Sequence, residues 1–179
     1  ETFPFLYPLV MHEPDPVPRN YGYGDEPVVF AFLDRVGAKR RVGAFICYEI
    51  LFPYVAADLV RSGAELLATV SNDQHLHDRA RWMTAAHGRI RAIETRRSVA
   101  RVNTVGYSMF SDAWGRLTHV APLDVAGSWL QPMQVHTGTT LYVRWGDWLP
   151  VACAAAVLGL LLAAAAGALR RHRLAAVPD

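Results

Sequence analysis

The C-terminal part of the sequence holds one uncharged apolar stretch, which restricts the possible folds more than any other feature. Residues Trp148 to Leu169 run for 22 positions without a charge, and a membrane-spanning helix needs about 20 apolar residues. The basic block Arg170–Arg173 follows at once. A buried alanine-rich core helix is the alternative, although such helices seldom run so long or end on basic residues. We therefore expect a transmembrane helix at 148–169, a cytoplasmic tail at 170–179, and a domain at 1–147 across the membrane.

Charge and cysteine content narrow the class further. The formal net charge is only +2, which argues against a nucleic-acid binder, because phosphate contacts need a concentrated basic surface. The two cysteines, Cys47 and Cys153, fall in the expected domain and the expected span, so no disulfide joins them. The sequence starts at Glu1 instead of Met and shows no signal peptide. We expect it to be the C-terminal part of a longer membrane protein.

Short apolar runs alternate with helical patterns along the domain, which predicts an α/β fold. A strand, a helix and a strand within about thirty residues make a right-handed crossover, so the sheet is expected to be partly parallel. Residues 1–27 are rich in proline, glycine and aromatic side chains, and predict a long irregular loop that packs on the core, lines a pocket or touches lipid. The expected strands are 28–33, 42–46, 65–70, 99–103, 106–111, 116–120 and 134–140, and the expected helices are 52–61 and 79–97.

The expected helix 79–97 carries two kinds of side chain. Met83, Ala86, Ile90 and Ile93 recur at helical spacing and form one apolar stripe. The arginines on the other faces are expected to be solvated or salt-bridged, with contact to anionic phospholipid head groups as the alternative. These arginines are Arg79, Arg81, Arg89, Arg91, Arg96 and Arg97.

Cys47 is the candidate nucleophile, because it ends the apolar run Val42–Ile46 just before a helix start at Pro53. Backbone N–H groups and the positive end of a helix dipole favour a thiolate at such a place. Glu49 adds a candidate acid–base or positioning group. A buried structural cysteine beside an arginine-paired glutamate is the alternative. Since ligands collect at the carboxyl ends of parallel strands, Ser71–Asp73 is expected beside Cys47.

His75 and His77, in the segment Gln-His-Leu-His-Asp, have the residue type of metal ligands. No third ligand stands at a persuasive spacing, so an exposed loop is expected in place of a metal site. Neither a metal nor another cofactor is expected.

Several segments together resemble the apolipoprotein N-acyltransferases, the membrane-bound members of the nitrilase, or carbon–nitrogen hydrolase, superfamily. The resemblance runs from the start of the chain to its end. The Cys-Tyr-Glu and Ser-Asn-Asp segments indicate a nitrilase-like domain, and the Tyr-x-Arg-x-Gly-x-Trp segment before a terminal span points to the acyltransferases. In order, the similar segments are Ile46–Ile50 with Phe52-Pro53, Leu67–Asp73, Arg89–Glu94, Arg101–Gly106 and Tyr142–Trp148.

This resemblance implies an α-β-β-α sandwich, of which the chain holds part, and a Glu-Lys-Cys triad. It implies transfer of a fatty acyl chain from a phospholipid, through a cysteine thioester, to the N-terminal amine of a diacylglyceryl-modified lipoprotein. Cys47 matches the nucleophile, Tyr48 and Glu49 match its functional neighbours, and Glu1 matches a second essential glutamate. The implied location is the bacterial inner (plasma) membrane, with the domain on the periplasmic side.

The sequence also departs from the family pattern. The triad glutamate and lysine are expected upstream, and the sole lysine, Lys39, does not match the triad position. Gln74–Leu76 stands where the family usually has an aromatic pair on a mobile arm. We therefore expect the isolated chain to be inactive. Two alternatives stay open: a membrane-anchored nitrilase-type amidase, and a non-catalytic module that binds lipid or lipoprotein.

Overall fold

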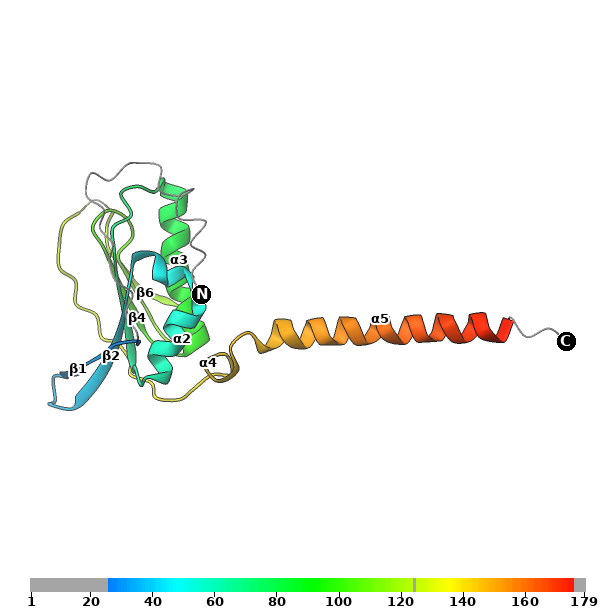
Figure 1. Ribbon diagram of the computed structural model, residues 1–179. Coiled ribbons are helices and arrows are strands. Elements are labelled where there is room, and N and C mark those ends of the chain that lie inside the picture. The colour runs from blue at the N-terminus through cyan, green and yellow to red at the C-terminus, as the bar shows by residue number, and fades with distance from the viewer. Residues whose placement is uncertain (1–25, 124, 176–179) are drawn as a thin grey trace.

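The computed structural model describes residues 26–123 and 125–175, which form one six-stranded sheet, a helical layer and a long C-terminal helix (Figure 1). Glu1 and nearly all of the loop predicted at 1–27 lie outside the described residues. The strands are β1 (Val29–Leu33), β2 (Lys39–Ile46), β3 (Leu66–Ser71), β4 (Val99–Asn103), β5 (Met109–Ser111) and β6 (Leu117–Val120). The helices are the 3-10 helix η1 (Cys47–Leu51), α2 (Pro53–Arg61), α3 (Asp78–Thr95), α4 (Leu141–Trp145) and α5 (Trp148–Ala175).

The sheet is mixed, and its strands lie side by side in chain order from β1 to β6. β2, β3 and β4 pair in parallel, while β1 at one side and β5 and β6 at the other pair antiparallel. The predicted partly parallel α/β sheet is thus confirmed. The strand predicted at 134–140 is wrong, because this segment joins no ladder. Its carbonyl groups accept hydrogen bonds from side chains instead. The Gln134 carbonyl accepts from the Ser98 hydroxyl and the Gly138 carbonyl accepts from Arg97 Nη1, each at 2.8 Å.

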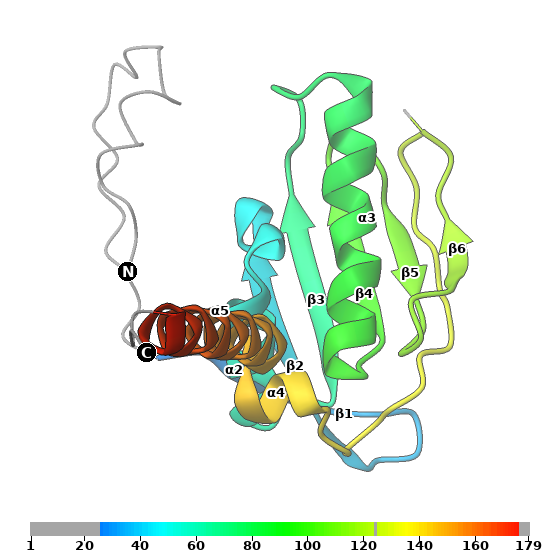
Figure 2. The same cartoon turned by 90° about the vertical axis from the view of Figure 1, so that its right-hand side faces the viewer.

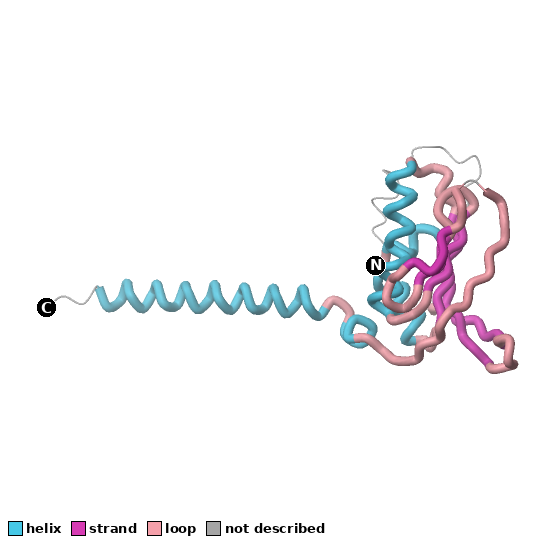
Figure 3. The backbone as a smooth tube through the Cα atoms, turned by 180° about the vertical axis from the view of Figure 1, so that it is seen from behind, coloured by secondary structure: helices cyan, strands magenta, loops and turns pink. Residues whose placement is uncertain are grey.

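Helices α2 and α3 cover one face of the sheet (Figures 2 and 3). The core between them and the strands includes Phe45 and Leu67, which are 1% and 0% exposed. On the opposite face, Ile46, Val70 and Val102 form a row across β2, β3 and β4 and are 64%, 53% and 57% exposed. The described residues therefore supply one α layer and one β layer of the expected sandwich.

The arginines of α3 do not all behave as predicted. Arg91 and Arg97, which follows the end of the helix, are buried, each 3% exposed. Arg91 is salt-bridged to Glu94, which is one of the two predicted arrangements, whereas Arg97 binds main-chain carbonyls and the prediction is wrong for it. Arg91 lies 3.3 Å from the Glu94 carboxylate. Arg97 donates to main-chain carbonyls, at 2.7 Å to that of Ala64. Burial lowers the pKa of both guanidinium groups, and the Glu94 charge opposes this at Arg91. At Arg97 the carbonyl partners replace the lost water, whereas Arg91 Nε and Nη1 are buried without a hydrogen-bond partner and depend on the nearby Glu94 charge.

The short helix α4 fixes the start of α5 to the domain. Val143 is 1% exposed and belongs to the core, and its carbonyl accepts a hydrogen bond of 2.6 Å from Arg61 Nε. The Thr140 hydroxyl oxygen caps α4 by accepting a hydrogen bond from the Val143 N–H, and the same hydroxyl donates a hydrogen bond to the Glu94 carbonyl. Among the described residues, Trp148–Gly167 is the one stretch long and apolar enough to cross a membrane, with a mean hydropathy of 2.3 and no buried residue. The core-helix alternative does not fit this exposure.

Gly43 on β2 lets α2 approach the sheet closely, and this contact can be tested. A Cβ at this position would lie 2.9 Å from Leu59 Cβ and 3.1 Å from Ala64 Cβ. Gly43→Ala is expected to lower the free energy of unfolding by about 1–3 kcal/mol through overpacking. At Gly138 an added Cβ would have no atom within 4 Å, so Gly138→Ala should change the free energy of unfolding by no more than about 0.5 kcal/mol. Urea unfolding of the detergent-solubilised chain measures both; equal losses would contradict the packing argument.

Candidate active site

Cys47 directly follows β2 and is the first residue of the 3-10 helix η1, where the chain turns sharply. Its φ of 52° falls in the left-handed region, and Arg96 is the only other non-glycine residue with positive φ in the described parts of the chain. For an L-residue this conformation costs about 1–2 kcal/mol. A strained strand-to-helix turn is a recurrent way to present a nucleophile outside a sheet, because the turn lifts the side chain away from its neighbours.

The neighbours of Cys47 support this turn. Glu49 Oε2 accepts a hydrogen bond of 2.6 Å from the Ile46 N–H, so its carboxylate ties the end of β2 to η1. Tyr48 is 50% exposed. Cys47 itself is partly exposed and unpaired. The alternative of a buried cysteine beside an arginine-paired glutamate does not fit these contacts, because the partner of Glu49 is the backbone. Cys47 and Glu49 thus remain the candidate nucleophile and positioning group.

The segment Ser71–Asp73 lies beside this turn, as the parallel topology predicts. Ile46 pairs with Val70, so Cys47 and Ser71 leave neighbouring strands at the same edge of the sheet. Asn72 is exposed, whereas Ser71 and Asp73 are 9% and 2% exposed. The carboxyl ends of β2 and β3 therefore bring the candidate nucleophile and a polar loop together.

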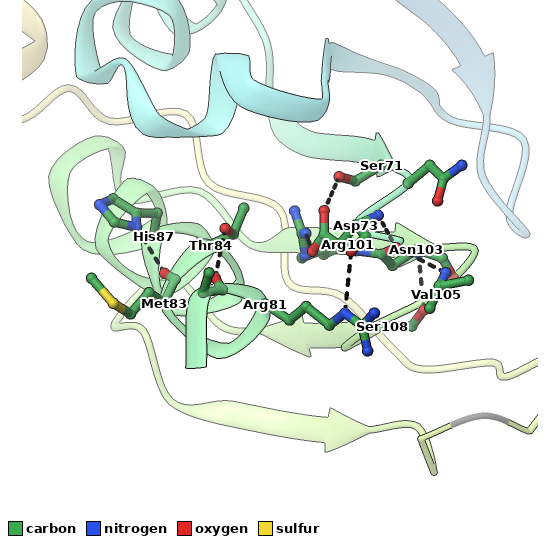
Figure 4. Close-up of polar contacts among 12 residues, drawn as sticks. Ser71, Asp73, Arg81, Met83, Thr84, His87, Arg101, Asn103, Val105 and Ser108 are labelled. Atoms are coloured by element: carbon green, nitrogen blue, oxygen red, sulfur yellow. Dashed lines mark hydrogen bonds and ion pairs between the residues drawn. The ribbon is translucent and has the colours of Figure 1, made fainter. Parts of the chain in front are cut away.

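A buried ion pair holds this loop (Figure 4). Arg101 on β4 donates from Nη2 to Asp73 Oδ2 at 2.6 Å, and both side chains are at most 1% exposed. Asp73 Oδ1 accepts from the Ser71 hydroxyl at 2.7 Å, and the Asp73 carbonyl accepts from Arg81 Nε at 3.1 Å. Sequence reasoning gave Arg101 no role. The signal was available, since Arg101 is the one charged residue of β4 and stands between Ala100 and Val102.

Asn103 and Gly106 complete the network on the β4 side. Asn103 Oδ1 accepts from the backbone N–H groups of Asp73 and Val105, each at 3.1 Å. Gly106 has a φ of 132°, and a Cβ there would lie 3.3 Å from Asp73 Oδ2. Position 106 therefore favours glycine for two reasons: its positive φ is unfavourable for other residues, and a Cβ would crowd the Asp73 carboxylate. The loops after β3 and β4 form one connected polar unit.

An apolar pocket of about 310 Å³ opens between η1 and the N-terminal half of α3. It begins at Tyr48, directly after the candidate nucleophile, and passes Leu76 in the divergent Gln74–Leu76 segment. The remaining lining residues are Leu51, Ala80, Met83, Thr84 and His87. Because aliphatic and aromatic side chains dominate this lining, the pocket suits a hydrocarbon chain better than a charged group.

Other predicted residues lie away from this edge. Lys39 begins β2, and at roughly 3.3 Å per residue it is about 26 Å from Cys47. His75 and His77 are exposed, and His77 Nδ1 accepts from the Ala80 N–H at the start of α3. Within residues 26–123 and 125–175, no three His, Cys, Asp or Glu side chains cluster in a way that could hold a metal ion.

This geometry defines a class of protein: an α/β domain whose parallel strands present a strained cysteine at their carboxyl edge. Residues 6–128, more than half of the chain, match the carbon–nitrogen hydrolase family. The chain belongs to this family.

Curated relatives give a closer comparison. An apolipoprotein N-acyltransferase of Thermotoga maritima is 34% identical over 163 residues, which cover 83% of this chain and 30% of the relative. One from Bordetella bronchiseptica is 37% identical, with 76% and 25% covered. The chain thus spans less than a third of the length of these relatives. Among solved structures, an amidase from Nesterenkonia sp. shares 17% identity with a TM-score of 0.47, covering 58% of this chain and 40% of the amidase.

The strain at Cys47 predicts an unusual order of stability between two variants. Cys47→Ala keeps a Cβ in the left-handed region, whereas Cys47→Gly removes it. We expect Cys47→Gly to be about 1 kcal/mol more stable than Cys47→Ala, although glycine normally destabilises ordered backbone. Thermal unfolding of the two variants in the same detergent measures the difference. A less stable Cys47→Gly would show that the turn is not strained.

The buried ion pair predicts a large effect at Asp73. Asp73→Asn leaves Arg101 buried without a counter-charge, and breaking such a pair costs about 3–5 kcal/mol. Asp58→Asn, which breaks the half-exposed surface pair with Arg61, is the matched control and should change the free energy of unfolding by at most about 1 kcal/mol.

A double variant keeps this test informative if Asp73→Asn folds poorly. Asp73→Asn combined with Arg101→Met removes both charges, so it should unfold at a higher urea concentration than Asp73→Asn alone. A double variant that is the less stable of the two would contradict the assignment of the loss to an unpaired buried charge.

Proposed function

We propose that this chain carries the nucleophile-bearing part of an apolipoprotein N-acyltransferase. The observation that carries the proposal is the apolar pocket beside the Cys47 turn. An acyl chain binds to apolar surface next to the reacting carbonyl, and this open pocket between η1 and α3 includes Tyr48, the residue after Cys47. The similarity to curated apolipoprotein N-acyltransferases over most of the chain supports the same reaction.

In the proposed reaction, the Cys47 thiolate attacks the carbonyl carbon of a phospholipid ester. The carbon–oxygen bond breaks, the lysophospholipid oxygen takes up a proton, and a thioester remains on Cys47. The N-terminal α-amine of a diacylglyceryl-cysteine lipoprotein then attacks the thioester. The carbon–sulfur bond breaks, the amine loses a proton, and the products are an amide and the free thiolate. The sequence of two half-reactions is a ping-pong mechanism.

Side chains near Cys47 take distinct parts in this proposal. Glu49 positions the turn through its hydrogen bond to the Ile46 N–H, and exposed Tyr48 forms the pocket wall nearest the reacting atoms. Backbone N–H groups at the turn stabilise the oxyanion of the tetrahedral intermediate. Glu1, the second essential glutamate by resemblance, lies outside the described residues. The triad glutamate and lysine are supplied by a preceding part of the same protein.

The membrane also has a role in the proposal. Residues 148–169 span the bacterial inner membrane, residues 1–147 form the periplasmic domain, and the basic tail 170–179 is cytoplasmic. Trp145 and Trp148, which pack edge to face with centroids 6.3 Å apart, mark the outer interface. Both substrates are lipid-anchored, so a membrane-anchored domain meets them at a raised local concentration.

The first test looks for the thioester on Cys47. The native full-length protein is incubated with a phospholipid that carries a labelled acyl chain, and its peptides are analysed by mass spectrometry. We expect an adduct with the mass of the acyl group on Cys47 and none in Cys47→Ala, because alanine has no nucleophile. Addition of a diacylglyceryl-cysteine peptide should remove the adduct and move the label to the peptide amine.

Other outcomes separate the alternatives. Release of labelled fatty acid without peptide acylation, together with turnover of a small amide, would favour a membrane-anchored amidase. Absence of any adduct, with equal lipid binding by both proteins, would favour a non-catalytic module. The sole lysine of the sequence, Lys39, lies at the opposite end of β2 from Cys47, so we expect the isolated 179-residue chain to form no adduct. An adduct on the isolated chain would refute that division of the triad.

A further inference from the structure

The outer face of α3 is apolar, which is the reverse of the usual pattern for a helix on a sheet. Trp82, Met83, Ile90 and Ile93 lie on the side of α3 opposite its buried residues and are 41%, 56%, 41% and 46% exposed. Trp82 packs edge to face on Tyr107, and Ile93 lies against Gly115 in the β5–β6 turn, so each of these two side chains is covered on one side only. The face toward the sheet instead carries small or polar side chains, listed as Thr84, Ala85, Gly88, Ala92 and Thr95. A contiguous apolar stripe of this kind, on the solvent side of a helix, marks an interaction surface.

Basic side chains border this stripe. Arg79 and Arg96 are exposed at the two ends of α3, and Arg89 is partly exposed along its side. Asp78 and partly buried Glu94 are the only acidic residues of the helix. An apolar stripe with a cationic border matches the lipid–water interface of an anionic membrane, where aliphatic and aromatic side chains enter the acyl boundary and arginines meet phosphates.

The direction of α5 favours the same partner. α5 runs away from the domain on the side of the sheet that α2 and α3 cover (Figure 1). Seen along α5, α3 lies in front of the sheet, so its outer surface faces the direction in which α5 extends (Figure 2). Only Gly146 and Asp147 separate α5 from α4, which is held in the core through Val143. If α5 crosses a bilayer, the outer face of α3 is therefore turned toward the surface of that bilayer.

We propose that the outer face of α3, defined by Trp82, Met83, Ile90 and Ile93, rests on the phospholipid surface from which α5 enters the membrane. The inference rests on the membrane span of the proposed function and adds a second contact to it. Met83 also lines the pocket that begins at Tyr48. The same contact would therefore place the pocket beside the Cys47 turn at the edge of the bilayer surface.

Nitroxide spin labels test this contact directly. Met83→Cys and Ile90→Cys are labelled in the full-length protein after Cys47→Ser and Cys153→Ala, and the protein is reconstituted into vesicles of phosphatidylethanolamine and phosphatidylglycerol. Val36→Cys, at an 86% exposed site in the β1–β2 turn, is the aqueous control, and Leu160→Cys in α5 is the lipid control. Collision rates with oxygen, which concentrates in lipid, and with a water-soluble nickel chelate are measured by electron paramagnetic resonance.

The labels at Met83 and Ile90 are expected to show an oxygen-to-nickel collision ratio severalfold above that at Val36 and close to that at Leu160. A ratio equal to that at Val36, with Leu160 in lipid, would overturn the α3 contact and leave the span intact. Shielding from both reagents would overturn it in favour of a protein that covers α3. Frequent collisions of the Leu160 label with the nickel chelate would overturn both the span and the α3 contact. The acyl transfer of the proposed function is tested independently by the thioester experiment, so the two failures can be told apart.

Discussion

The buried ion pair between Asp73 and Arg101 is the interaction on which the geometry of the site depends. Removing two charges from water costs several kcal/mol per ion, and the pair repays this only when its geometry is held firmly. Its partners come from the loop after β3 and from β4, and the Asp73 carbonyl also accepts from Arg81 of α3. One acidic residue therefore fixes two strands, a helix and the loop beside Cys47 relative to one another.

Much of the fold was predictable because local signals agreed with the tertiary structure. Pro53 does start α2, at the first position where its missing N–H is harmless, and Gly63 follows the helix end with a φ of 98°. The crossover rule gave the parallel order of β2, β3 and β4. Because parallel strands end at one edge, the same rule predicted that Cys47 lies next to Ser71.

The orientation of α3 and the fate of its arginines were not predictable from periodicity. A stripe at helical spacing identifies one face of a helix but does not tell which face meets the sheet. Here Gly88 and Ala92 allow close approach, and the larger Met83 and Ile90 remain outside. Likewise, the burial of Arg97 depends on main-chain carbonyls that distant segments bring together. The strand wrongly predicted at 134–140 has the same cause, which is bonding to distant side chains. A sequence does not show whether the carbonyl groups of an extended segment accept from a neighbouring strand or, as here, from the side chains of Arg97 and Ser98.

The open face of the sheet has a consequence for how the protein reaches its folded state. Ile46, Val70 and Val102 belong to three parallel strands, and parallel pairing requires each crossover to close before the next strand docks. While this happens, the row they form offers apolar surface to any other unfinished chain, and such surface promotes aggregation. The yield of native protein should therefore depend on chain concentration during folding and on how quickly this face is shielded, more than on the strength of the finished sheet.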